Sequence, residues 1–134
     1  MSSELRVNIL RGSTANGNIT IQGEGTSNLG GATMQLQQGL AKQWVSFDPD
    51  DFNVDDSLNC TSISDGPNAG EQTPNFVNNM NNSDYVVNAL VMENQERMLR
   101  VETRSTSSYT TQNTNDGGVA KDDLMGCLVH GDLA

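Results

Sequence analysis

The chain has 134 residues, of which 34% are hydrophobic and 4% aromatic, and its formal net charge is −10 at pH 7. A single chain this polar buries little apolar area against roughly 1–2 kcal/mol of backbone entropy per residue, so it is either partly disordered or shares a core with identical copies. Residues 43–96 hold ten acidic residues and no basic one. Such a surface excludes nucleic acid and anionic membranes as partners, because binding phosphates requires clustered Lys and Arg.

The sequence predicts a protein made in a cytoplasm and not inserted into a membrane. No apolar run approaches the roughly 20 residues of a membrane span, and residues 1–5 lack the pattern of a signal peptide. The two cysteines, Cys60 and Cys127, have no metal-binding spacing. We expect both to be small buried side chains of strands, and a disulfide between them stays open.

The first 42 residues predict an anchor and a neck. Apolar and polar residues alternate over 5–11, and a second strand is predicted over 18–22 after a turn that contains Asn16-Gly17. Residues 23–31 include four glycines and predict a linker. Thr33 then caps a predicted helix, in which Leu36 and Leu40 form a small apolar stripe that could pack about a threefold axis.

From Gln43 onward the patterns predict β-structure. Trp44 and the pair Val45 and Phe47 point to opposite faces of the first strand, and we interpret Trp44 as a core anchor, with a sugar-stacking platform as the alternative. Further strands are predicted over 72–77, at an edge or beginning at Pro74, and over 124–130. A hairpin is predicted from strands 85–92 and 97–104, with its turn at 93–96. The predicted core residues are Trp44, Val45, Phe47, Phe76, Leu99 and Val101.

The acidic loop 48–56 offers a weak metal candidate. Asp51, Asn53 and Asp55 have the spacing of the first ligands of a calcium loop, but the glycine and glutamate that such a loop needs are replaced by Asp56 and Ser62. A solvated loop is the expected alternative.

No catalytic residue and no cofactor are predicted. A pair of carboxylates for glycoside hydrolysis would need apolar sequence to desolvate one of them, and the acids here lie in polar sequence. The single histidine, His130, lies four residues from the C-terminus in a strand-like run and has no partners for a nucleophile triad. We therefore expect a protein that is not an enzyme.

Residues 105–118 are polar and low in complexity, which predicts a long exposed loop. Such loops carry recognition or simply connect strands. The candidate receptor contacts in it are Ser107, Tyr109, Gln112 and Asn113.

Several motifs resemble one module across residues 36–134. They are Lys42-Gln43-Trp44-Val45-Ser46-Phe47-Asp48, Asp56-Ser57-Leu58-Asn59-Cys60-Thr61-Ser62-Ile63-Ser64-Asp65, the turn into Tyr85, and Gly131-Asp132-Leu133-Ala134. Together they resemble a module of bacteriophage tail fibres and other virion surface proteins. The chain departs from that module at Asp55, where an arginine is common, and at Pro74.

The resemblance implies an all-β virion protein. We expect virion-attachment strands and a Gly-rich linker over 1–32, a short helical neck over 33–42, and a compact antiparallel β-sandwich knob over 43–134. The expected assembly is a homotrimer that contacts other virion proteins through its N-terminus. The expected role is a short tail fibre or spike that recognises a host cell-surface glycan or protein. A capsid fibre, decoration or other structural component is the alternative, and a polysaccharide depolymerase is the third.

Overall fold

The computed structural model describes residues 7, 9–10, 19–22, 33–35, 39–92 and 96–134, and the chain divides into two compact units, Met1–Leu40 and Ala41–Ala134. In the first unit, strand β1 (Thr20–Gln22) pairs antiparallel with β2 (Thr33–Gln35). Strand β2 therefore occupies the place of the first turn of the expected helix. Residues 36–38 of that helix, Leu36 included, lie outside the described residues, and Leu40 is described and exposed.

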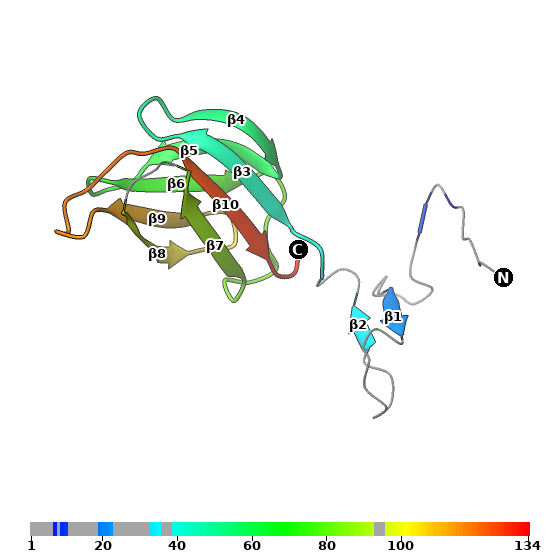
Figure 1. Ribbon diagram of the computed structural model, residues 1–134. Helices are drawn as coiled ribbons and strands as arrows, with labels where there is room; N and C mark the ends of the chain where they lie inside the picture. The colour runs from blue at the N-terminus through cyan, green and yellow to red at the C-terminus, as the bar shows by residue number, and fades with distance from the viewer. Residues whose placement is uncertain (1–6, 8, 11–18, 23–32, 36–38, 93–95) are drawn as a thin grey trace. The chain divides into compact units, whose positions relative to one another are not determined.

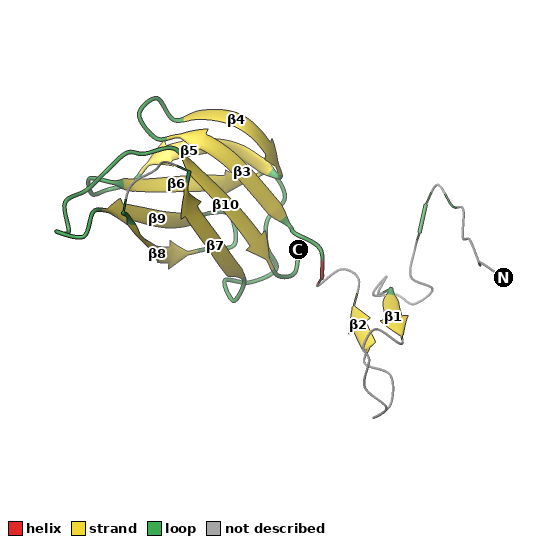
Figure 2. Ribbon diagram, in the orientation of Figure 1, coloured by secondary structure: helices red, strands yellow, loops and turns green. Residues whose placement is uncertain are grey.

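The second unit is an antiparallel β-sandwich, as predicted (Figures 1 and 2). The first sheet has the strand order β4-β3-β10-β7, from Asn53–Leu58, Gln43–Asp48, Met125–His130 and Val86–Val91. The second sheet has the order β5-β6-β9-β8, from Cys60–Asp65, Glu71–Phe76, Tyr109–Thr114 and Met98–Arg104. Among the described residues, no helix is long and apolar enough to cross a membrane.

The apolar core lies between the two sheets, on the inward positions of alternating strands. Of the predicted core residues, Val45, Phe47 and Phe76 are buried, and Leu99 is half-buried against them. Trp44 and Val101 are each 38% exposed, so their assignment to the core is wrong. Because successive side chains of a strand point to opposite faces, burying Val45 and Phe47 places Trp44 on the outer face of the first sheet.

Three aromatic side chains, Phe76, Tyr85 and Tyr109, join the sheets at the centre of the core. The Phe76 and Tyr85 rings meet edge to face with centroids 5.6 Å apart, and Phe76 lies 5.7 Å from Tyr109. The Tyr109 hydroxyl donates to Oε1 of buried Gln43 at 2.7 Å, and the Tyr85 hydroxyl lies 2.9 Å and 2.8 Å from the carbonyl oxygens of Ser105 and Ser108. Both polar tips thus find acceptors inside the fold, as buried tyrosines require.

Asn59 closes one side of the sandwich. It alone separates β4 from β5, and its φ of 59° bends the chain from the first sheet into the second. Asparagine tolerates this left-handed conformation better than most residues. Its amide donates to the carbonyl oxygens of Lys42 (2.9 Å) and Asn78 (3.1 Å), and its Oδ1 accepts from the Asn78 amide at 2.6 Å. The hydrogen bonds to Lys42 and to Asn78 therefore hold the bend in place.

Strand β6 corrects the expectation that Pro74 marks an edge strand or the start of a strand. Strand β6 lies between β5 and β9, and Pro74 is buried within it. The ladder to β9 pairs Glu71 and Gln72 and resumes only at Asn75, so the missing proline N–H falls in a gap of that ladder. A hydrogen bond between the hydroxyls of Thr73 and Thr110, at 2.9 Å, spans the gap.

The predicted hairpin of residues 85–104 is wrong in its pairing. Strands β7 and β8 lie close to the predicted positions, but β7 pairs with β10 in the first sheet and β8 pairs with β9 in the second. Each is the last strand of its sheet, and the two edges lie next to each other (Figure 1). We call the boundary between them the β7–β8 seam.

The predicted loop over 105–118 is also corrected. Residues 109–114 form β9, an inner strand of the second sheet in which Tyr109, Gln112 and Asn113 are buried. Ser107 is exposed in the turn that precedes the strand. The inward-facing Thr111 and Asn113 are polar, so this part of the sandwich interior is polar, and sequence polarity gave no sign of burial.

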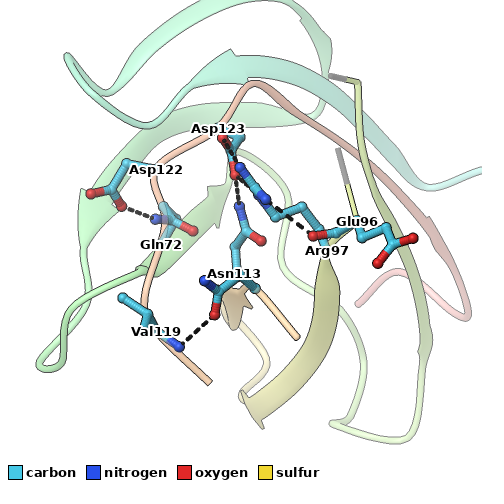
Figure 3. A network of polar contacts seen from close by, with 8 residues as sticks. Gln72, Glu96, Arg97, Asn113, Val119, Asp122 and Asp123 are labelled. Carbon is cyan, nitrogen blue, oxygen red and sulfur yellow. Dashed lines mark hydrogen bonds and ion pairs between the residues drawn. The ribbon is translucent and has the colours of Figure 1, made fainter. Parts of the chain in front are cut away.

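Polar groups hold the strand ends at one side of the sandwich (Figure 3). The guanidinium of Arg97 forms an ion pair with Asp123, with Nη2 3.0 Å from Oδ1, and Asn113 Nδ2 donates to the same carboxylate at 2.9 Å. Gln72 Nε2 donates to Asp122 Oδ1 at 2.9 Å. The other ends of the two amides, Gln72 Oε1 and Asn113 Oδ1, are buried without a hydrogen-bond partner among the described residues. Leaving a buried acceptor unpaired costs free energy.

Replacing Asp123 with Asn should destabilise the sandwich by about 3 kcal/mol, because it leaves the guanidinium of Arg97 buried without its counter-charge. The side chains of Arg97 and Asp123 are only 9% and 12% exposed. The matched control is Asp122→Asn, which keeps an oxygen for Gln72 on an exposed residue and should change the free energy of unfolding by less than about 0.5 kcal/mol. Urea denaturation measures both. Equal changes in the free energy of unfolding for Asp123→Asn and Asp122→Asn would contradict a special role of the ion pair.

The sandwich should lose stability as pH rises above about 9. Burial raises the pKa of Cys127 to about 12 and that of Tyr85 to about 12, and burial also raises the pKa of Tyr109. In the unfolded chain these groups lose their protons near their ordinary pKa values, about 8.5 for Cys and 10 for Tyr. The folded state then binds more protons, so the free energy of unfolding falls by on the order of 1.4 kcal/mol per pH unit and group.

Urea denaturation between pH 7 and pH 11 measures this decline. In the variant Cys127→Ala, the decline between about pH 9 and pH 10 should be shallower, because Cys60, whose pKa burial also raises, and the tyrosines remain. A free energy of unfolding that stays constant to pH 11 would contradict the burial of these groups.

Candidate functional site

The outer face of the first sheet carries an apolar patch centred on Trp44. Trp44 lies opposite Leu58 on β4 and opposite Leu128 on β10. Directly opposed residues of antiparallel strands share a face, so these three side chains form one row across the sheet. At the far edge, Val86 and Leu90 of β7 lie opposite His130 and Gly126. We call the surface formed by Trp44, Leu58, Val86, Leu90 and Leu128 the Trp44 face.

The Trp44 face is exposed. Leu58, Leu90 and Val86 have exposed fractions of 48%, 53% and 64%, beside the 38% of Trp44. Met92, also exposed, packs next to Leu90 over Gly126, where a Cβ would lie 3.4 Å from the Met92 sulfur. Single exposed apolar residues need no explanation, but a contiguous group around the only tryptophan marks a binding surface.

Hydrogen-bonding side chains surround the Trp44 face. Asp56 of β4 lies opposite Ser46 of β3, in the row next to Trp44, and the Ser46 hydroxyl donates to Asp55 Oδ2 at 3.2 Å. Asn88 lies opposite Leu128, and His130 lies opposite Val86 at the end of β10. The face therefore combines an aromatic ring with carboxylate, amide and hydroxyl groups at its border.

Of the metal candidates, Asp51 lies in the turn between β3 and β4, and Asn53 and Asp55 belong to β4. Asp51 Oδ1 accepts a hydrogen bond from the Asn53 backbone amide at 2.9 Å, while Asp55 accepts from Ser46. These oxygens thus stabilise the turn and the strand. Within the described part of the chain, no three His, Cys, Asp or Glu side chains gather closely enough to hold a metal ion.

The β7–β8 seam holds two hollows that adjoin each other. One, of about 300 Å³, is lined by Val86, Val87, Val101, Glu102, Thr103 and Arg104. The other, of about 220 Å³, is lined by Val87, Asn88, Ala89, Leu99, Arg100 and Val101. Because Val87 and Val101 belong to both, the hollows form one groove along the strands. It is lined by apolar side chains together with polar and charged ones such as Glu102 and Arg104, and it is bordered by two strand edges that pair with no other described strand.

The cysteines are both free in the structure, Cys60 half-buried on β5 and Cys127 buried on β10. Burial raises the pKa of both thiols, which keeps them protonated and unreactive at neutral pH. Their expected burial is thus confirmed for Cys127 and partial for Cys60. No known protein family, curated protein or solved structure matches this chain.

Sequence reasoning found Trp44 but placed it in the core, and it missed the seam. The alternation of Trp44 with Val45 and Phe47 did not show which face of the strand lies inside the sandwich. Two signals pointed to the seam. Strand β7 has the uncharged sequence Val-Val-Asn-Ala-Leu-Val, and the connection after it, residues 92–97, contains no glycine and so lacks the Asn-Gly or Asp-Gly pair of a tight hairpin.

Trp44→Lys should fold, whereas Phe47→Lys should not. On the outer face, the lysine stem can cover apolar surface while its ammonium reaches water, at a cost of about 1–2 kcal/mol. At position 47, which is fully buried, the ammonium would have to lie inside the core. Circular dichroism with urea denaturation measures both. Loss of folding in Trp44→Lys would place the indole in the core instead.

Proposed function

We propose that this chain is a bacteriophage virion surface protein, a short tail fibre or spike, whose β-sandwich binds a glycan on the host cell. The observation that carries the proposal is the exposed Trp44 face. The resemblance of the motifs around Trp44, Asp56 and Tyr85 to the phage module supports the assignment to a virion.

The chemistry of the Trp44 face suits a sugar. An indole offers a flat apolar surface together with an N–H donor, which complements the C–H face and the hydroxyl groups of a pyranose ring. Asp56, Ser46 and Asn88 border the indole row and provide acceptors and donors for hydroxyl groups. The sheet beneath is rigid, so little conformational entropy is lost on binding. The Trp44 face takes the place of the buried strand β9 as the proposed receptor contact.

The proposed assembly is a homotrimer anchored to the virion by its first unit. Only Glu4, Arg6, Arg11 and Glu24 are charged in the first 40 residues, so the whole net charge of −10 belongs to residues 41–134. The two units therefore differ in charge as well as in fold. This difference suits two separate roles, with the first unit as an anchor and the second unit as an acidic, soluble knob.

A capsid fibre or decoration protein is the second candidate, because the same apolar face would also suit a contact with another virion protein. In that case the face would be covered in the particle, and its loss would affect the particle rather than its attachment to cells.

Particles that carry Trp44→Ala should adsorb to host cells at least tenfold more slowly than wild-type particles. The control is Phe52→Ala, which removes the other half-exposed aromatic ring, located in the β3–β4 turn outside the Trp44 face. Adsorption rate, incorporation into particles and thermal stability of the particles are measured together. Normal adsorption by fully loaded Trp44→Ala particles rejects the receptor role, and a selective loss of particle stability favours decoration.

A further inference from the structure

The β7–β8 seam is built to receive another β-strand. The opposite side of the sandwich is closed by the Asn59 bend, whereas β7 and β8 belong to different sheets and each leaves one backbone edge unpaired among the described residues. An exposed edge strand is a template for pairing with a further strand. In the groove beneath these edges, Val87, Ala89, Leu99 and Val101 offer contacts for the apolar side chains of such a strand, among polar and charged neighbours.

Strand β7 lacks the features that protect edge strands. Its six residues carry no charge, no proline and no bulge, and Val86 and Leu90 are more than half exposed. Strand β8, by contrast, carries Arg100, Glu102 and Arg104 and has a bulge between Val101 and Thr103. Uncovered, such a β7 edge would promote aggregation, so a folded protein requires a partner for it.

The first unit contains a segment with the matching properties. Residues 5–10 read Leu-Arg-Val-Asn-Ile-Leu, six residues like β7, with Leu5, Val7 and Ile9 on one side of an extended chain. Val7, Ile9 and Leu10 are 53%, 66% and 51% exposed and lie outside any strand of the structure. Val7 and Ile9 lie on one side of the extended segment and gain by burial together, at about 1.5–3 kcal/mol for each large side chain, whereas Leu10 lies on the side of Arg6 and Asn8.

Charge is compatible with the same pairing. Residues 5–11 carry Arg6 and Arg11 and no acid, and the sandwich carries the net charge of −10. On an added strand, Arg6 and Asn8 alternate with the apolar side chains and face solvent, where Glu102 is the acidic neighbour in the seam and Arg100 and Arg104 are the basic ones.

We infer that residues 5–10 of a neighbouring copy fill the β7–β8 seam as an added strand, with Val7 and Ile9 over Val87 and Val101. Each copy gives a strand to the next and receives one from the previous, a head-to-tail arrangement that closes into a ring. The inference rests on the homo-oligomer of the proposed function and identifies the contact that joins neighbouring copies in it. It assigns residues 5–10 to the neighbouring copy and leaves virion contacts to the rest of the first unit.

The test uses the purified full-length chain, with its mass measured by light scattering and native mass spectrometry. In Val7→Gln/Ile9→Gln and in Val101→Gln, the dissociation constant of the oligomer should rise on the order of 100-fold, because apolar side chains at the junction are lost. The controls are Asn8→Gln on the solvent side of the same segment and Val119→Gln, an exposed valine in the turn after β9. Both controls should assemble like wild type.

Mixing the two defective variants should restore association. Val7→Gln/Ile9→Gln retains an intact seam and Val101→Gln retains an intact segment, so one proper junction forms between them and yields a mixed dimer. Hydrogen exchange of those backbone amides of residues 86–91 that point away from β10 should be slow in wild type and fast in Val7→Gln/Ile9→Gln, whereas the amides bonded to β10 should stay protected in both.

Three outcomes overturn the inference and separate it from the proposed function. A wild-type oligomer that Val7→Gln/Ile9→Gln leaves intact rejects the strand exchange and keeps the homo-oligomer. An oligomer that only Val101→Gln disrupts assigns the seam to another segment. A monomeric wild type rejects both the strand exchange between copies and the trimer.

Discussion

The conformation of one residue, Asn59, determines how the two sheets of this sandwich are connected. With φ of 59° and three side-chain hydrogen bonds to Lys42 and Asn78, it turns the chain from the edge of the first sheet to the edge of the second without a loop. One side of the sandwich is thereby continuous. Each sheet ends on its other side in a strand, β7 or β8, that has no such connection. The asymmetry between a closed and an open side follows from this bend.

The interior reflects the composition of the chain. Ten buried apolar residues make a small core around Phe76, Tyr85 and Tyr109. Beyond it, Gln72 of β6 and Thr111 and Asn113 of β9 point inward. The Asp123 carboxylate, paired with Arg97, accepts a hydrogen bond from Asn113 in this polar part of the interior. Polar groups supply geometric specificity but little net free energy, because each replaces hydrogen bonds to water. A core of this kind benefits from apolar area gained in contacts with other copies, which is what an occupied seam would add.

Much of the fold could be predicted from the sequence, because alternation fixes strands locally. The strands at 43–48, 85–92, 97–104 and 124–130 lie close to their predicted positions, and the antiparallel sandwich is confirmed. Which strands pair with each other could not be predicted in the same way. Strands β7 and β8 follow each other in sequence, but their partners β10 and β9 come later in the chain, and no local pattern encodes that choice. Strand β9 escaped prediction because two of its three inward residues are Thr111 and Asn113, types that are usual in exposed loops, although the third is Tyr109 of the core.

The candidate site shows the same limit at the level of single residues. Period-two alternation says that Trp44 and Phe47 face opposite ways, but it cannot say which face is inside. The structure decides through β10 and β4: Cys127 and Met125 lie opposite Val45 and Phe47 and complete a buried layer, which leaves Trp44 with Leu58 and Leu128 outside. An exposed tryptophan among exposed apolar neighbours on one sheet face is the observation on which the proposed receptor contact rests. The seam and the Trp44 face share strand β7, with Val87 facing the seam and Val86 facing outward. Assembly through the seam would therefore fix the strand that borders the Trp44 face, and would hold several copies of that face in one particle, where weak individual binding sums to firm attachment.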